Sequence, residues 1–139
     1  MLNNSRVAGV LPAMDIDRAI SFYHDKLGIE AMKTGSEAIM KAGSGTAFML
    51  YERPSWQCEV TQLSFMVDNL DQQMQELKSK GVMFEDYDLP YLQTVNGVYA
   101  DETGKVAWFR DSEGNIISIM EPSMEQQRIY EKAMSMASM

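Results

Sequence analysis

The fold is decided by the stretch Ala107-Trp108-Phe109-Arg110-Asp111-Ser112-Glu113-Gly114-Asn115-Ile116-Ile117-Ser118. β-Branched and aromatic residues predict two strands here, Val106 to Phe109 and Ile116 to Met120. Between them, residues 111–115 are Asp, Ser, Glu, Gly and Asn, a composition that favours a tight turn. The stretch therefore predicts a hairpin, with Ser118 on its second strand.

The chain around this hairpin contains an internal repeat. The apolar run Val10 to Met14 precedes Asp15, which can cap a helix that ends before Gly28. Leu63 to Val67 precedes a second helix, which ends at Gly81. Strand-like runs follow each helix, at 29–33, 37–42 and 46–52 in the first half and at 82–86, 97–101, 106–109 and 116–120 in the second. Each half is therefore interpreted as a βαβββ module.

Both predicted helices carry an apolar stripe that should face the core. The stripes are Ile16, Ala19, Ile20, Tyr23 and Leu27 in the first helix, and Leu70, Met74 and Leu77 in the second. Beyond Pro122, Ser123 can cap a further helix with an uneven apolar side. We expect a single domain, 1–139, with module one at about 6–54, module two at about 58–122 and the C-terminal helix at about 123–136.

Composition limits the class of protein. A chain of 139 residues with 45% hydrophobic content is long enough for one domain with a core of its own. The net charge of -8 repels polyanions, which argues against nucleic acid and anionic membranes as partners. The single Cys58 cannot form an internal disulfide, no apolar run approaches the ~18 residues of a spanning helix, and Met1 to Arg6 lacks a signal-peptide core. We expect a cytoplasmic protein.

Two segments resemble signatures of the glyoxalase/bleomycin-resistance/dioxygenase proteins, the vicinal oxygen chelate superfamily. One is the hairpin series from Phe109 to Ser118, and the other runs from Leu11 to Gly28, including Arg-Ala and Phe-Tyr pairs and a closing Leu-Gly. The resemblance extends from about Val7 to Glu121. It implies an α+β fold in which two tandem βαβββ modules form curved mixed β-sheets around a cavity. It also implies a homodimer, and both domain-swapped and side-by-side pairings fit the sequence.

Members of this superfamily usually hold a metal ion with His, Glu or Gln from the first and fourth strands of each module. The resemblance places these positions at Ala8, Met49, Gln62 and Ser118. Of these, Gln62 alone offers a ligand for a hard metal ion. A shift of two residues along each strand keeps the same face, and it reaches Val10, Ala47, Tyr51, Val60, Ser64, Ile116 and Met120, none of them His, Asp or Glu. We therefore expect no metal site and no cofactor.

Other residues with catalytic chemistry are explained more simply by structure. His24 lies in the polar run His24-Asp25-Lys26 and is interpreted as a surface side chain, while Cys58 is interpreted as a small packed residue. Gly43-Ser44-Gly45 is not followed by the Lys that a phosphate-binding loop requires, so it is interpreted as a turn. The acidic residues beside the metal positions, Glu52, Glu59 and Glu121, should face outward.

A set of thioether, aromatic and small polar side chains could instead contact a ligand. The candidates are Met49, Tyr51, Gln62, Ser64, Met66, Tyr91, Trp108 and Ser118. Trp56 and Tyr99 are expected near a cavity mouth as well. The alternative for Met49, Met66 and Trp108 is that they fill the core, and for Tyr91 that it belongs to an ordinary connecting loop at 88–97.

Two hypotheses about function follow. The first is a small-molecule-binding protein without the usual metal, similar in architecture to the bleomycin-resistance branch of the superfamily. The second is a lyase or dioxygenase-type enzyme of the same fold with non-standard metal ligands, acting on a thiol-conjugated aldehyde or an aromatic compound. Metal content after purification distinguishes them.

Overall fold

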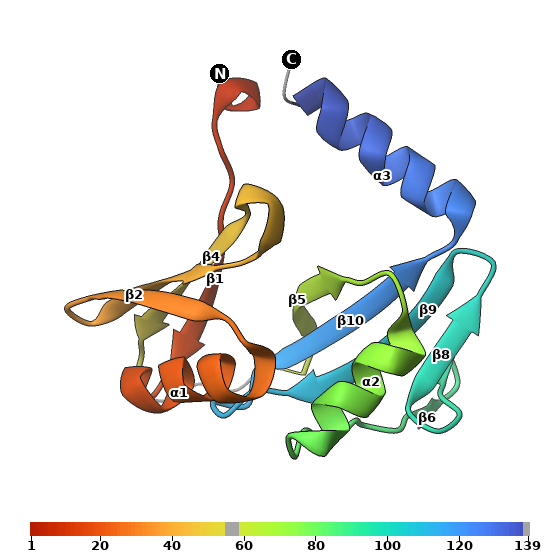
Figure 1. Cartoon of the computed structure of the whole chain (residues 1–139), viewed down its shortest axis with the longest axis horizontal. Helices are drawn as coiled ribbons and strands as arrows, with labels where there is room; N and C mark the ends of the chain where they lie inside the picture. Colours follow the sequence, from red (N-terminus) through yellow and green to blue (C-terminus); the bar gives the residue numbers. More distant parts are fainter. Residues whose placement is uncertain (55–58, 138–139) are drawn as a thin grey trace. The chain divides into compact units, whose positions relative to one another are not determined.

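The computed structural model describes residues 1–54 and 59–137, so Trp56 and Cys58 lie outside the described residues (Figure 1). Contacts within the chain divide it into two units. The first comprises Met1–Leu63 and Arg110–Ile116, and the second comprises Ser64–Phe109 and Ile117–Met139. None of the described helices is long and apolar enough to cross a membrane.

The first unit contains one four-stranded sheet and one long helix. In chain order its elements are the short 3-10 turn η1 (Leu2–Asn4), β1 (Gly9–Ala13), α1 (Ile16–Leu27), β2 (Glu30–Thr34), β3 (Glu37–Lys41), the 3-10 turn η2 (Gly43–Gly45) and β4 (Ala47–Glu52). The sheet has the order β1-β4-β3-β2. β1 runs parallel to β4, whereas β2 and β4 are antiparallel to β3, so the sheet is mixed.

Helix α1 begins and ends where local sequence chemistry places it. The side chain of Asp15 accepts a hydrogen bond from the Arg18 amide at 3.0 Å, and Gly28 ends the helix in the left-handed conformation with φ 71°. Tyr23 is fully buried, and its ring packs edge-on against Phe48 of β4 at 5.3 Å between centroids. Ile16, Ala19 and Tyr23 of the predicted stripe are buried, while Ile20 and Leu27 are half-buried. The helix therefore covers one face of this sheet.

The second sheet repeats the strand order of the first. The remaining elements are β5 (Thr61–Met66), α2 (Leu70–Ser79), β6 (Asp88–Leu89), β7 (Leu92–Gln93), β8 (Val98–Asp101), β9 (Gly104–Arg110), β10 (Ile116–Pro122) and α3 (Met124–Ala137). The sheet order is β5-β10-β9-β8, which matches β1-β4-β3-β2 strand for strand. Leu70, Met74 and Leu77 of α2 are all buried, as the stripe predicts. The prediction of an α+β fold with two βαβββ modules is confirmed.

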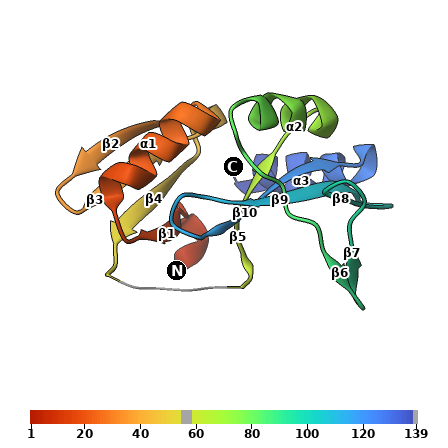
Figure 2. The same cartoon turned by 90° about the horizontal axis from the view of Figure 1, so that it is seen from below.

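The segment after α2 differs from its prediction. No strand forms at 82–86, where Phe84 alone bridges to Phe109 of β9. The reason is Asp86, whose carboxylate accepts hydrogen bonds from the Gly97 amide at 2.7 Å and the Thr94 hydroxyl at 2.8 Å, and so draws the chain out of the ladder. The predicted loop at 88–97 contains the small β6–β7 hairpin. Figure 2 shows this hairpin and α2 on opposite sides of the β8–β9–β10 sheet.

Glu121 is predicted to face outward, away from the Ser118 side of its strand, and its side chain reaches the start of α2. Its carboxylate accepts the backbone N–H of Leu70 at 2.9 Å, beside the cap that Asn69 provides through the Gln72 amide. The first turn of a helix has N–H groups without helical partners, and these attract a carboxylate. Glu121 therefore fixes the start of α2 against the end of β10.

Candidate functional site

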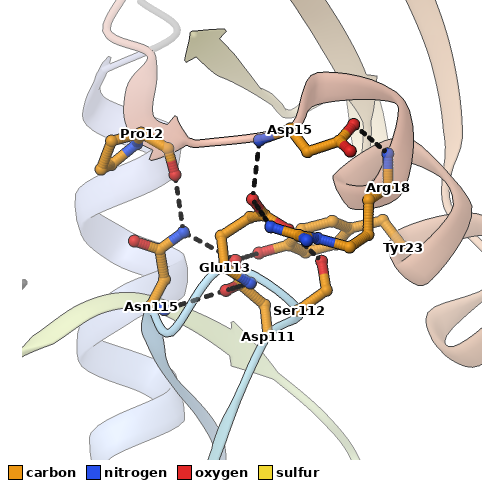
Figure 3. A network of polar contacts seen from close by, with 8 residues as sticks. All are labelled: Pro12, Asp15, Arg18, Tyr23, Asp111, Ser112, Glu113 and Asn115. Carbon is orange, nitrogen blue, oxygen red and sulfur yellow. Dashed lines mark hydrogen bonds and ion pairs between the residues drawn. The ribbon is translucent and has the colours of Figure 1, made fainter. Parts of the chain in front are cut away.

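A buried polar network in the first unit connects the 111–115 turn to α1 (Figure 3). The carboxylate of Asp111 is at its centre. Its Oδ2 accepts hydrogen bonds from the Tyr23 hydroxyl and the Asn115 side-chain amide, each at 2.7 Å. Its Oδ1 accepts the backbone N–H groups of Glu113 and Asn115, each at 2.9 Å. Four donors thus converge on one buried carboxylate.

Glu113 makes the second connection to α1. Arg18 donates to it from Nε at 2.8 Å and from a terminal nitrogen at 2.9 Å, forming a two-pronged ion pair. The backbone N–H of Asp15 and the hydroxyl of Ser112 donate to the same carboxylate at 2.9 and 2.8 Å. The 111–115 segment is therefore bonded to the start of α1 through Glu113 and to a later part of the helix through Asp111 and Tyr23.

The network shifts the pKa values of four of its members, and the hydrogen bond and charge of Glu113 raise the pKa of Arg18. Burial raises the pKa of Asp111, although the hydrogen bonds from Asn115 and Tyr23 oppose this shift. Burial and the adjacent Asp111 raise the pKa of Tyr23 well above 10.0. Burial acts to raise the pKa of Glu113, but hydrogen bonds from Arg18 and the Asp15 amide hold it below its usual value.

These groups bond to one another and stabilise the fold. Asn115 completes the network by donating to the Pro12 carbonyl at 3.0 Å, which ties the turn to β1. Its own Oδ1 is the one buried side-chain oxygen without a hydrogen-bond partner among the described residues. The hairpin that decides the fold is therefore also a polar part of the core, a role that its turn composition did not reveal.

The open face of the first sheet, the face opposite α1, presents an apolar row across all four strands. Strand register places Val10 opposite Met49, Met49 opposite Ile39, and Ile39 opposite Met32. Val10 and Met32 are each 53% exposed, and Met49 is half-buried. Tyr51, two residues beyond Met49, points to the same side because side chains alternate along a strand. Met49 and Tyr51 therefore share the open face, as predicted for strand neighbours.

Sequence reasoning missed Met32 and Ile39 as members of this row. Their strands are short and carry consecutive apolar residues, Ala31-Met32 and Ala38-Ile39-Met40, so the sequence does not mark which of these side chains faces away from α1. What the sequence lacked was the register that brings them next to Met49.

Ser64, Met66, Trp108, Ser118 and Met120 lie on the face of the second sheet opposite α2, which is called its open face. Ser64 and Met66 are exposed on this face, whereas Ser118 is buried, with 3% of its surface exposed. Ser118 donates a hydrogen bond to Ser64 at 2.7 Å, which shows that the two neighbouring strands turn these side chains to one side. Trp108 lies between the buried Ala107 and Phe109 and so points the opposite way from the core. Its ring contacts Tyr87 edge-on at 5.5 Å between centroids, a neighbour that sequence reasoning did not identify.

Gln62 and Tyr91 were also predicted to contact a ligand. Gln62 uses its side-chain oxygen to accept the Ile116 backbone N–H at 3.2 Å, so that oxygen supports strand pairing. Tyr91 lies at the turn between β6 and β7 and is 80% exposed. Among the described residues, no hydrogen bond or ring contact joins Tyr91 to Trp108 or to the serine pair.

The four residues that the resemblance places at metal positions do not have the chemistry to hold a divalent ion. Ala8 lacks a donor atom and precedes β1, Met49 offers only a thioether, and Ser118 is bonded to Ser64. The side-chain oxygen of Gln62 is already paired. Within residues 1–54 and 59–137, no group of three or more His, Cys, Asp and Glu side chains could hold a metal ion. His24, the lone histidine, is a surface residue with its side chain 66% exposed.

Comparisons with known proteins agree with this architecture. Residues 6–119 match the family described as Glyoxalase/Bleomycin resistance protein/Dioxygenase superfamily. The solved structure of UcmS2 is 21% identical, with a TM-score of 0.64, and the match covers 84% of this chain and 98% of that one. TnmS3, an antibiotic binding protein from Streptomyces sp. CB03234, is also 21% identical, with a TM-score of 0.64 and coverage of 85% and 97%.

A third similar structure is of a fosfomycin resistance protein. It is a mutant of FosX from Listeria monocytogenes, complexed with Mn(II) and 1S,2S-dihydroxypropylphosphonic acid. It is 16% identical, with a TM-score of 0.61 and coverage of 88% of this chain and 94% of that one. No curated protein matches the chain significantly. At these identities the likeness to solved structures establishes the fold.

Proposed function

Because the chain belongs to the Glyoxalase/Bleomycin resistance protein/Dioxygenase superfamily, we propose that it is a small-molecule-binding protein that works without a bound metal ion. The observation that carries this proposal is the Ser64–Ser118 hydroxyl pair, at 2.7 Å, where the superfamily usually has a metal-binding Glu. Two neutral hydroxyls can accept and donate hydrogen bonds to an organic ligand, whereas they are poor ligands for a divalent ion.

The side chains around the serines indicate the kind of ligand. Met66 is 47% exposed, and Trp108 contributes a flat ring with a hydrogen-bonding edge. The first sheet carries a further apolar surface, the row formed by Val10, Met49, Ile39 and Met32. Such surfaces suit a small, partly apolar or aromatic molecule. The antibiotic-binding relative TnmS3 supports the same class of function.

The proposal includes the assembly that the resemblance implies. We infer one domain of two modules, and a homodimer located in the cytoplasm. Helix α3 supports the dimer, because its Met124 and Ile129 are 76% and 55% exposed. Light scattering measures the mass directly.

We expect purified protein to contain well under one divalent metal ion per chain. Gln62 and Ser118 are the polar residues at the four positions, and both are hydrogen-bonded within the protein. A metal ion would have to displace these bonds without the several strong ligands that offset its dehydration. Elemental analysis measures the content, and treatment with a chelator should leave the melting temperature unchanged. One tightly held ion per chain would instead favour the enzyme hypothesis.

Trp108→Ala should weaken ligand binding about tenfold or more while the protein stays folded. The expected loss reflects one aromatic contact, worth roughly 1–2 kcal/mol in a binding site. A thermal-shift screen of bleomycin and planar aromatic antibiotics selects the ligand, and calorimetry then measures its affinity. Ser118→Ala should give a smaller loss, because Ser64 retains one hydroxyl. Met83→Ala removes an 84% exposed side chain and serves as the control. Equal affinity in Trp108→Ala and wild type would contradict the proposed site.

A further inference from the structure

We propose that helix α3 completes a pocket for the ammonium group of an organic cation, next to Met66 at the end of β5. The inference rests on the proposed function in one respect, since Met66 also belongs to the open face of the second sheet. It goes further by naming a charge for the ligand and by assigning a role to α3. The family match ends at residue 119, and α3 begins at Met124, so this helix lies outside the matched residues.

The start of α3 is held in place by the turn between β8 and β9. The backbone N–H of Ser123 donates to the Thr103 carbonyl at 2.8 Å. Ser123 then caps the helix, because its hydroxyl accepts the Gln126 backbone N–H at 3.1 Å. Asp101 shapes the turn itself by accepting the Thr103 backbone N–H at 2.8 Å and its hydroxyl at 2.6 Å. The direction in which α3 leaves the sheet is therefore set by specific bonds.

A cavity of about 150 Å³ lies between this helix and the end of the sheet. Its lining residues are Met66, Val67, Asp68, Pro122, Gln127, Tyr130 and Glu131. Three of these come from α3, so the cavity depends on the helix. A neighbouring hollow shares 66–68 and continues along α2 past Gln72 and Glu76. The 66–68 segment therefore lines both hollows, one beside α3 and the other beside α2.

The chemistry of the lining selects a cation. Asp68 and Glu131 are its charged members, and no Lys, Arg or His is among the described residues that line either hollow. Gln127 donates to Glu131 at 3.2 Å and so orients that carboxylate. The ring of Tyr130 and the thioether of Met66 add polarisable surface, which favours an ammonium group through cation–π and dispersion contacts. An anion would meet two like charges.

The volume limits the size of the group that enters. A cavity of about 150 Å³ holds an ammonium group with a short alkyl chain or one ring, and a larger body would extend toward the open face at Met66. The basic residues of α3, Arg128 and Lys132, each follow a lining residue directly in sequence. Successive helical residues point about 100° apart, so Lys132 points away from Glu131 and Arg128 away from Gln127. Arg128 lies three residues before Glu131, on a neighbouring part of the helix surface, and neither basic residue is part of the lining. The cation preference therefore comes from the pocket and agrees with the net charge of -8.

The test uses the full chain and three small probes of similar shape: 2-phenylethylammonium, neutral 2-phenylethanol and anionic 3-phenylpropanoate. Amide NMR titrations should show the ammonium probe shifting signals of residues 66–68 and 127–131, with at least fivefold weaker binding of the alcohol. Glu131→Gln should lower the affinity for the ammonium probe about fivefold, and Tyr130→Ala should also lower it. Glu125→Gln removes a charge from the same helix outside the lining, and should change the affinity by less than twofold.

Equal binding of the ammonium and alcohol probes, or an unchanged affinity in Glu131→Gln, would overturn the ammonium pocket. Trp108→Ala separates this inference from the proposed function. If planar ligands bind in a Trp108-dependent way but 2-phenylethylammonium does not bind near α3, the pocket is wrong and the proposed function stands. If the ammonium probe binds near α3 while no ligand depends on Trp108, the pocket stands and the proposed function is wrong.

Discussion

Asp111→Ala is expected to lower the free energy of unfolding by about 3–5 kcal/mol, because it leaves four converging donors without their acceptor. Tyr23 and Asn115 lose their side-chain partner, and two backbone N–H groups of the turn lose theirs. These groups are buried, so water cannot replace the carboxylate without opening the core. Urea denaturation followed by circular dichroism measures the change.

Tyr23→Phe provides the graded control for this prediction. It keeps the ring that packs on Phe48 and removes a single donor to Asp111, so the expected loss is about 1.5–3 kcal/mol. The raised pKa of Tyr23 adds a pH signature. Above pH 10.0 the unfolded state releases the tyrosine proton before the folded state does, so wild-type stability should fall as pH rises. Tyr23→Phe should reduce this alkaline fall. A loss below 1 kcal/mol in Asp111→Ala would show that the network contributes little.

Local patterns in the sequence were sufficient to predict the two modules. Asp15 and Gly28 mark the ends of α1 through capping chemistry that depends on a few neighbouring residues. The stripe of Leu70, Met74 and Leu77 identifies the buried side of α2 in the same way. Alternation along β4 also placed Met49 and Tyr51 on the side away from the core. Each of these features depends only on residues that are close together in the sequence.

Features that depend on distant residues could not be predicted in this way. Tyr23 and Asp111 lie 88 residues apart, and Leu70 and Glu121 lie 51 apart, so composition gave no sign that these pairs would bond. Glu121 was expected to face outward because it lies three positions from Ser118 and side chains alternate along a strand, but alternation gave no sign that the start of α2 would supply a donor there. The serine pair is similar: alternation predicted the face, but only the pairing of β5 with β10 brought the two hydroxyls to 2.7 Å. Register therefore determined most of the candidate site.

Gly104→Ala is expected to lower the free energy of unfolding by about 2–4 kcal/mol and to release α3 from its position. Gly104 has φ 141°, a conformation that alanine rarely adopts, and an added Cβ would clash with the Glu121 carbonyl oxygen. It would also lie 2.9 Å from the Pro122 Cα and 3.0 Å from the Ser123 nitrogen. These are backbone atoms at the junction of β10 and α3, so they cannot move aside as a flexible side chain would.

The matched control is Gly35→Ala, which makes the same change at a positive φ of 63° with no atom within 4 Å of the added Cβ. It should therefore incur only the backbone cost, about 1 kcal/mol. The additional loss of unfolding free energy in Gly104→Ala, compared with Gly35→Ala, measures the cost of the steric clash at the β10–α3 junction. Since the Ser123–Thr103 bond fixes the start of α3, the amide signals of 127–131 should shift in Gly104→Ala and stay unchanged in Gly35→Ala. Equal losses in the two variants would mean that the turn can yield without disturbing the helix, and that α3 is held by other contacts.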